Sequence, residues 1–235
     1  MIAVQPFARL GHFQNEWLNA RHHFSFGSYR DPSRNGVGDL LVWNDDEIAP
    51  GTGFDPHPHR DMEIVTYVRE GAITHRDGLG NSGRTEAGDV QVMHAGTGIT
   101  HAEYNEESIP TRLFQIWIHP AERGVAPGWG TRTFPKGEAT HGALVPLADG
   151  RASADGSALP LHADAAVLAG TLRKGQTVRH TLGAGRVGYL VPSSGALTVN
   201  GVAVNTRDGA TVTDEDEISI TATEDAEVVL VDVLK

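Results

Sequence analysis

The chain has 235 residues, enough for one large or two small domains with a core that needs no disulfides. It contains no cysteine, which excludes disulfides, cysteine nucleophiles and thiolate ligands, so a metal site must use nitrogen and oxygen donors. The formal net charge is −11 with no basic stripe, and no apolar run approaches about 20 residues, so neither nucleic-acid nor membrane binding is expected. Because the first residues lack a basic and apolar leader, we expect a cytoplasmic location.

The first 37 residues form an irregular, aromatic-rich segment, and the best candidate for a helix, a short one, falls near 12–19. The aromatic side chains are interpreted as the cover of a core, with the mouth of a pocket as the alternative. His22 and His23 are adjacent, so in an extended chain they point to opposite faces and are poor joint ligands.

Strand-like runs begin at Asp39 and are separated by turn residues at short intervals. In the first half, the predicted strands span 39–44, 64–69, 72–77, 90–94, 100–105 and 112–119. In the second half, they span 165–172, 177–181, 187–191, 196–200, 202–205, 210–213, 217–222 and 227–233. Short strands at this spacing, together with 28 glycines, predict an all-β fold of the sandwich or barrel type.

Residues 120–142 include a stretch rich in glycine and proline, and we place a domain boundary within them, with one domain over 1–130 and the other over 131–235. Both halves contain a Gly-led turn followed by a strand and a later Gly-Asp or Asp-Gly step, which indicates a weak internal duplication. The histidines of the second half stand singly and are interpreted as surface or structural residues. The chemistry is therefore expected in the first half.

Four potential metal ligands occur in the first half as two pairs. His57 and His59 lie two residues apart, just before the strand-like run at 64–68, and His101 and Glu103 form a second such pair. Alternate residues of a strand point to one face about 6.6 Å apart, so a pair can converge on one ion with bonds of about 2.1 Å. The four side chains predict one metal site inside a small β-barrel. Three imidazoles and one carboxylate suit Fe(II), Mn, Co, Ni, Cu or Zn.

The same stretches resemble the conserved motifs of the cupin family. The first motif is resembled by Gly51-(five residues)-His57-x-His59-(three residues)-Glu63, with a closing glycine one residue later than the common pattern. The second is resembled by Gly98-x-x-His101-x-x-x-Asn105, which lacks the usual proline. Longer strings resemble pirins more specifically, namely Asn44-Asp-Asp, Gly51-x-Gly-Phe, His57-Pro-His-Arg-Asp-Met-Glu63, Gly96-Thr-Gly-Ile-x-His101-x-Glu103 and Gln115-Ile-Trp117.

The resemblance implies a bicupin, an all-β protein with two jelly-roll β-barrels in tandem, of which the first binds metal and the second is degenerate and metal-free. In pirins, the residues that hold the metal are those matching His57, His59, His101 and Glu103. The residue matching Glu63, a ligand in many other cupins, is not a ligand in pirins. Some bacterial pirin-like proteins resemble quercetin 2,3-dioxygenases in activity.

These features predict a metal-dependent dioxygenase that cleaves flavonols such as quercetin and releases CO. The ion, with Fe(II) first among the candidates, would hold the ionised 3-hydroxyl group of the substrate, and O₂ would be the second substrate. Glu103 is the predicted general base that accepts the 3-hydroxyl proton. The alternative is a pirin-like regulatory protein that binds metal, responds to redox state through a protein partner and has no turnover.

Other side chains near the predicted ligands are assigned by proximity in the sequence alone. A cupin acting as an isomerase or lyase on an anionic sugar or acid would place Arg60, Arg69 or Arg112 in the cavity. The candidates for orienting the imidazoles are Asp61, Glu63, His94 and Asn105. The side chains that either line the cavity or belong to the core are Phe54, Met62, Met93 and Trp117.

Overall fold

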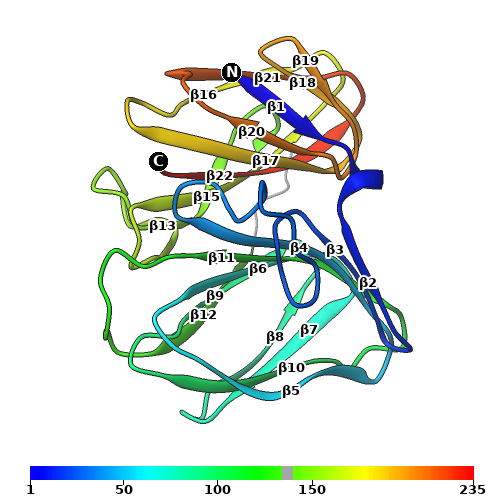
Figure 1. Cartoon of the computed structure of the whole chain (residues 1–235), viewed down its shortest axis with the longest axis vertical. Coiled ribbons are helices and arrows are strands. Elements are labelled where there is room, and N and C mark those ends of the chain that lie inside the picture. Colours follow the sequence, from blue (N-terminus) through cyan, green and yellow to red (C-terminus); the bar gives the residue numbers. More distant parts are fainter. Residues whose placement is uncertain (134–139) are drawn as a thin grey trace.

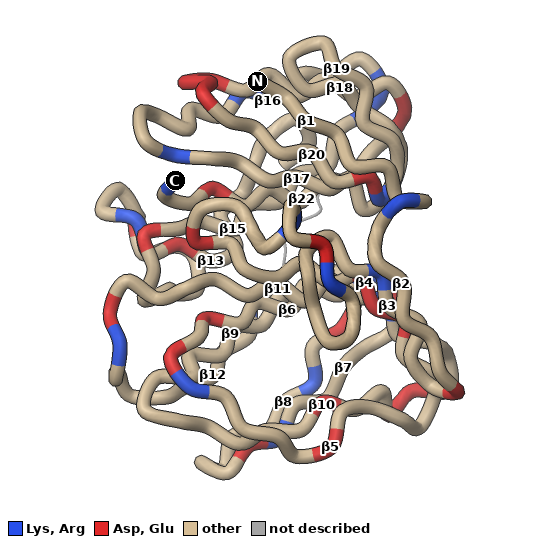
Figure 2. The backbone as a smooth tube through the Cα atoms, viewed as in Figure 1, with Lys and Arg blue, Asp and Glu red and all other residues tan. Residues whose placement is uncertain are grey.

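The computed structural model describes residues 1–133 and 140–235 and consists almost wholly of β-strands (Figure 1). Four sheets form two stacked units, each of which combines a seven-stranded sheet with a four-stranded sheet. The described residues contain one short helix, the 3-10 turn η1 (Phe7–Arg9), and no helix among them is long and apolar enough to cross a membrane. Positions of both charge signs are scattered over both units (Figure 2).

In the first unit, a seven-stranded sheet of order β12-β9-β6-β11-β4-β3-β2 faces a four-stranded sheet of order β5-β10-β7-β8. The larger sheet consists of β12 (Gly128–Thr133), β9 (Asp89–His94), β6 (Glu63–Glu70), β11 (Thr111–Ile118), β4 (Leu40–Ile48), β3 (Leu18–His22) and β2 (Gly11–Gln14). The smaller sheet consists of β5 (Thr52–His59), β10 (Ile99–Asn105), β7 (Ala72–Asp77) and β8 (Ser82–Glu86).

The second unit repeats this layout with sheet orders β1-β20-β17-β22-β15-β13-β14 and β16-β21-β18-β19. Its larger sheet consists of β1 (Ile2–Gln5), β20 (Gly209–Val212), β17 (Arg186–Ser194), β22 (Ala226–Leu234), β15 (Ala165–Leu172), β13 (Val145–Asp149) and β14 (Leu159–Pro160). Its smaller sheet consists of β16 (Thr177–Thr181), β21 (Glu217–Ala222), β18 (Leu197–Val199) and β19 (Val202–Val204). Strand β1 pairs with β20, so the chain begins in the sheet of the second unit before it enters the first.

The two seven-stranded sheets pack against each other through one hydrophobic cluster. Trp43 and Phe114 of the first unit and Tyr189 of the second are fully buried there, and the rings of Trp43 and Tyr189 lie 5.5 Å apart. Because side chains alternate along a strand, the intervening residues of β4 and β11 point the other way, into the first unit. The packing between units therefore fixes which residues of these strands face the interior of the first unit.

The interiors of the two units differ in chemistry. The second unit is filled by aliphatic side chains, among them Ile218, Ile220 and Leu230. The first unit has two smaller apolar clusters, and buried polar side chains such as Gln91 and Glu103 lie between its sheets. Among the described residues, the first unit therefore has buried polar side chains between its sheets where the second has an aliphatic core.

The all-β tandem arrangement predicted from the sequence is confirmed, and the predicted strands agree with the observed ones to within a few residues. The short helix expected near 12–19 is wrong, because β2 and the start of β3 form an antiparallel pair there. The strand predicted just after His57 and His59 is confirmed as β6, and the two histidines themselves lie on a further strand, β5, which was not predicted. The domain boundary within 120–142 stays a prediction, and residues 134–139 of it lie outside the described residues.

Candidate metal centre and its cavity

Two neighbouring strands bring three imidazoles together. His57 and His59 alternate along β5, and His57 is the register partner of His101 on β10. The ring centroid of His57 lies 4.8 Å from that of His59 and 4.6 Å from that of His101, and the centroids of His59 and His101 are 5.0 Å apart. One nitrogen of each ring lies within 4.8 Å of the other two, so the three rings can share one ion.

A local irregularity sits beside this cluster. The pairing of β10 with β5 shifts between His101 and Glu103, so that Glu103 pairs with Phe54. At Gly53, a Cβ atom would lie 2.2 Å from the backbone oxygen of Glu103, which leaves no room for a side chain. Such irregularities occur often next to active sites, where they redirect a side chain. Here the shift lies between two of the predicted ligands.

A chain of hydrogen bonds orients the His101 ring. His75 is fully buried, its Nε2 lies 3.2 Å from Oδ2 of Asp77 and its Nδ1 lies 3.3 Å from Nδ1 of His101. If His75 donates Nε2–H to the carboxylate, its Nδ1 accepts Nδ1–H from His101. Nε2 of His101 then presents a lone pair, and this buried atom has no hydrogen-bond partner among the described residues. Carboxylate–histidine partners of this kind fix the tautomer of metal-binding histidines.

A backbone carbonyl orients the His57 ring, and burial favours the neutral form of His59 and His101. Nδ1 of His57 donates to the backbone carbonyl of Asp55 at 2.7 Å, which leaves Nε2 as the lone-pair atom. Burial, with a smaller contribution from His57, lowers the pKa of His59 to about 4. Burial and the neighbouring imidazoles lower the pKa of His101 to about 3. Both rings are therefore neutral at physiological pH, the state in which imidazole binds a metal.

Glu103 is clamped by two amide side chains. Its Oε1 accepts from Nε2 of Gln91 at 2.6 Å, and its Oε2 accepts from Nε2 of Gln115 at 2.8 Å. Burial raises the pKa of Glu103 to about 7, and the two amide donors act in the opposite direction. Glu103 groups with His75 and His101 rather than with all three clustered imidazoles. The structure thus brings the three histidines together and places the carboxylate beside one of them.

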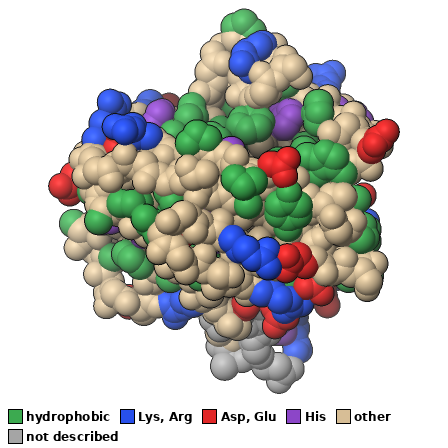
Figure 3. All heavy atoms as spheres, turned by 90° about the horizontal axis from the view of Figure 1, so that it is seen from below, with side chains coloured by type: hydrophobic (Ala, Val, Ile, Leu, Met, Phe, Trp, Pro, Cys, Tyr) green, Lys and Arg blue, Asp and Glu red, His purple; other side chains and the backbone are tan. Residues whose placement is uncertain are grey.

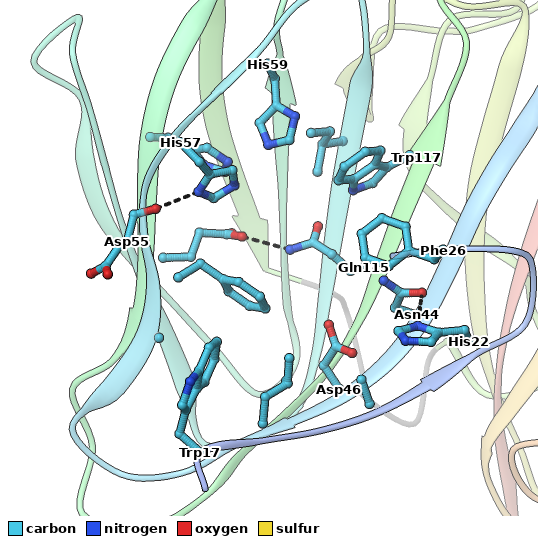
Figure 4. A pocket seen from close by; sticks show the side chains of 17 residues that line it. Trp17, His22, Phe26, Asn44, Asp46, Asp55, His57, His59, Gln115 and Trp117 are labelled. Atoms are coloured by element: carbon cyan, nitrogen blue, oxygen red, sulfur yellow. Dashed lines mark hydrogen bonds between the residues drawn. The ribbon is translucent and has the colours of Figure 1, made fainter. Parts of the chain in front are cut away.

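A cavity of about 430 Å³ opens onto these groups (Figure 4). Its aromatic lining comes from Trp17, Phe26, Phe54 and Trp117. The other lining residues are Leu18, Ala20, His22, Asn44, Asp46, Gly53, Asp55, His57, His59, Ile64, His101, Glu103 and Gln115. A largely apolar cavity of this size with a few convergent polar groups is typical of a small-molecule site.

Several assignments by sequence proximity are wrong in the structure. Nδ1 of His94 lies 2.6 Å from Oε2 of Glu63, which also accepts from the backbone N–H of His162, so this pair faces the second unit. Asp61 accepts from the backbone of Gly124, and the Asn105 amide donates to the carbonyls of Ile48 and Ile109. The imidazoles and Glu103 are oriented instead by the side chains and backbone of Asp55, His75, Gln91 and Gln115.

The structure also separates cavity residues from core residues. Phe54 and Trp117 line the cavity, whereas Met62 and Met93 pack in an apolar cluster. Arg69 pairs with Asp45, and Arg112 pairs with Glu47 and Glu70. Arg60 lines a neighbouring pocket together with His59, and within 1–133 and 140–235 the lining of the 430 Å³ cavity contains no lysine or arginine. Figure 3 shows that hydrophobic and histidine side chains reach the surface of the face seen there, beside scattered charges.

Sequence reasoning missed His75, Gln91 and Asp46 as cavity or support residues. Their signal is a polar residue at a buried position of a strand, as in Val90-Gln91-Val92. That signal is readable only once the strand's inward face is known, because alternation alone does not say which face is inside. His22 and His23 behave as expected, since His22 contacts Asn44 in the cavity and His23 contacts Tyr189 in the other unit.

The fold and the site together define a tandem cupin protein with a candidate metal centre in its first domain. The sequence model described as pirin matches residues 4–118, and the model described as the quercetinase C-terminal cupin domain matches residues 150–233. A pirin-like protein of Caulobacter vibrioides is 60% identical over 232 residues, which cover 99% of both chains. The chain belongs to the pirin family.

Two further relatives carry more specific descriptions. A protein of Escherichia coli named quercetin 2,3-dioxygenase is 42% identical over 233 residues, which cover 99% of this chain and 98% of that one. The crystal structure of the bacterial pirin YhhW of Escherichia coli in complex with nickel(II) superposes with a TM-score of 0.92 at 39% identity, and the match covers 100% of this chain and 99% of that chain. The nickel(II) complex agrees with a divalent metal in this fold.

Proposed function

We propose that the protein is a metal-dependent dioxygenase that cleaves flavonols such as quercetin with release of CO. The observation that carries the proposal is the cluster of His57, His59 and His101 at the wall of an aromatic-lined cavity. The quercetin 2,3-dioxygenase name of the Escherichia coli relative points in the same direction. The substrates would be a flavonol-like molecule and O₂.

The residues present fit a divalent transition metal. Nε2 of His101 is buried without a hydrogen-bond partner among the described residues, as expected of an atom that binds a metal ion. We assign His57, His59, His101 and Glu103 as the ligands, and Fe(II) as the first candidate, with Mn, Co, Ni, Cu or Zn as alternatives. When bound, such an ion supplies Lewis-acid binding of an ionised hydroxyl group and a place for O₂.

Glu103 is the proposed proton acceptor. A base must hold the proton that it takes, and in the metal-free protein burial raises the pKa of this carboxyl to about 7, so it binds a proton more readily than an ordinary carboxyl. The amides of Gln91 and Gln115 hold its two oxygens, so the carboxylate keeps its direction while it takes the substrate's 3-hydroxyl proton. The aromatic side chains of the cavity bind the flat rings and exclude water.

The test is metal analysis of protein loaded anaerobically with Fe(II), Mn, Co or Ni, followed by quercetin turnover on the same samples. One ion per chain with quercetin cleavage is the expected result. One ion per chain without turnover on any flavonol or catechol would instead favour the regulatory alternative, in which the redox state of the metal alters contact with a protein partner. Failure to bind any metal would overturn the ligand assignment itself.

A further inference from the structure

The side chain of Asp46 is a buried carboxyl at the wall of the cavity, and the proposed mechanism gives this carboxyl no role. The residue is 2% exposed, and its Oδ1 has no hydrogen-bond partner in the described part of the chain. Its register partners on the flanking strands are Ala20 of β3 and Leu113 of β11, neither of which has a polar side chain. Leaving a buried polar atom unpaired is costly, so such an atom calls for a reason.

The neighbouring aspartate shows what a structural role looks like in this strand. Asp45 points to the opposite face of β4, where its two oxygens pair with Arg69 and with Arg207 of the second unit. Both aspartates are buried, but Arg69 and Arg207 form their ion pairs with Asp45, and Arg69 acts on Asp46 only at longer range. Stabilisation of the interface between the units therefore accounts for Asp45 and not for Asp46.

The position of Asp46 in the cavity suggests what it meets. In Figure 4, Asp46 lies across the cavity from His57 and His59, beyond Gln115, and its carboxyl points into the cavity. Two other lining atoms are buried without a partner among the described residues, namely Nε2 of His101 and Nε1 of Trp117. Trp117 lies against His59 at the histidine end. Asp46 thus provides a polar group across the cavity from His57 and His59.

We propose that Asp46 binds a hydroxyl group of the substrate on the side of the cavity across from His57 and His59. The inference rests on the proposed function and narrows its substrate class to aromatic compounds that carry a metal-chelating hydroxyl at one end and a further hydroxyl at the other. Trp17 and Phe54, whose rings meet at 5.1 Å, would flank the second ring.

The electrostatics of the site agree with this role. Burial, followed by the nearby charges of Asp45 and Glu103, raises the pKa of Asp46 well above its usual range. A neutral carboxyl both donates and accepts a hydrogen bond, so it suits a phenolic hydroxyl, which also does both. Arg69, which pairs with Asp45 on the other face of β4, acts in the opposite direction with a smaller effect on the pKa of Asp46.

The test compares two ligands on Zn(II)-loaded protein under anaerobic conditions. Quercetin has hydroxyls on both ring systems, whereas 3-hydroxyflavone keeps only the chelating hydroxyl. Asp46→Leu should raise the dissociation constant of quercetin by about tenfold, since one buried hydrogen bond is lost, and leave that of 3-hydroxyflavone within about twofold. Asp46→Asn, which retains a donor and an acceptor, should fall between the wild type and Asp46→Leu.

The matched control is Glu47→Gln, because Glu47 is the next residue of β4 and its carboxylate faces Arg112 outside the cavity. It should change neither affinity. Metal content and melting temperature of each variant verify folding, and Asp46→Asn carries the test if Asp46→Leu does not fold. Equal effects of the Asp46 variants on both ligands, or no effect on either, would overturn the role proposed for Asp46 and leave the proposed function in place. Failure of both ligands to bind the metal-loaded wild type would overturn the proposed function together with it.

Discussion

The two units share one sheet layout and differ in what fills them. Strand β10 occupies the second place in the small sheet of the first unit, and β21 occupies the same place in the second. The buried positions of β10 carry Ile99, His101, Glu103 and Asn105, whereas those of β21 carry Ile218, Ile220 and Ala222. The same backbone layout thus supports a functional site or an apolar core, depending on which side chains occupy the alternate positions of a strand that face inward.

The difference also explains how a polar interior is tolerated. Each buried polar group in the first unit needs a partner, and Glu103 has two amide donors for this reason. The aliphatic interior of the second unit and the cluster shared by the large sheets supply hydrophobic stabilisation that the cavity does not. We therefore expect substitutions in the first unit to change chemistry and those in the second to change stability.

The largest expected effect is loss of the metal on replacement of a histidine in the cluster. His101→Ala should reduce metal content from one ion per chain to a small fraction and abolish turnover, because two imidazoles hold an ion much more weakly than three. His180→Ala is the matched change in the second unit, where this ring contacts Asp232. His180→Ala should lower the melting temperature and leave the metal content unchanged. Loss of metal in both variants would contradict the proposed difference between the two units.

Ile220→Ala should give the converse result. Ile220 is fully buried in the aliphatic cluster, so truncation should lower the free energy of unfolding by about 2–5 kcal/mol. Metal content per folded chain should not change. Chemical denaturation followed by metal analysis of the refolded sample measures both quantities, and a variant that folds normally yet lacks metal would contradict the separation of roles.

Glu103→Gln should separate proton transfer from metal binding. The amide keeps the shape and one ligand oxygen but cannot accept the substrate proton, so turnover should fall by about 10²-fold or more. Metal content should fall by a smaller factor than turnover. Steady-state rates normalised to bound metal check this, and full turnover in the variant would show that another group is the base.

A smaller effect than those of the substitutions is expected from pH, because titration of Glu103 should change both stability and metal affinity. The folded metal-free protein holds the Glu103 proton more tightly than an ordinary carboxyl, with its pKa raised from 4.5 to about 7, so its stability should decrease as pH rises through this range. The ion needs the carboxylate, so metal affinity should rise by about tenfold per pH unit up to about pH 7 and then level off. His59 and His101, with pKa values of about 4 and 3, are neutral throughout this window.

Melting curves of metal-free and metal-loaded protein between about pH 5 and pH 8 provide the measurement. The difference between the two melting temperatures should widen as pH rises. Parallel curves would mean that Glu103 neither binds the metal nor titrates as described.

Much of this could be read from the sequence, and the remainder has a physical cause. The spacing of His57 and His59, and the string around His101, predicted the three rings that converge, because strand alternation fixes which side chains share a face. Contacts between residues of different strands could not be predicted in this way. His75 reaches His101 from β7, which pairs with β10 in the same sheet, whereas Gln91 reaches Glu103 from β9 of the opposite sheet.

The measurement that tests the central claim most directly is the stoichiometry of the reaction. Protein loaded anaerobically with one Fe(II) per chain is mixed with quercetin and a known amount of O₂, and CO, O₂ and quercetin are followed in the same vessel. We predict one CO released and one O₂ consumed for each quercetin lost, and no reaction by His101→Ala. Quercetin loss without CO, or equal rates in the wild type and His101→Ala, would contradict a dioxygenase site in the first unit.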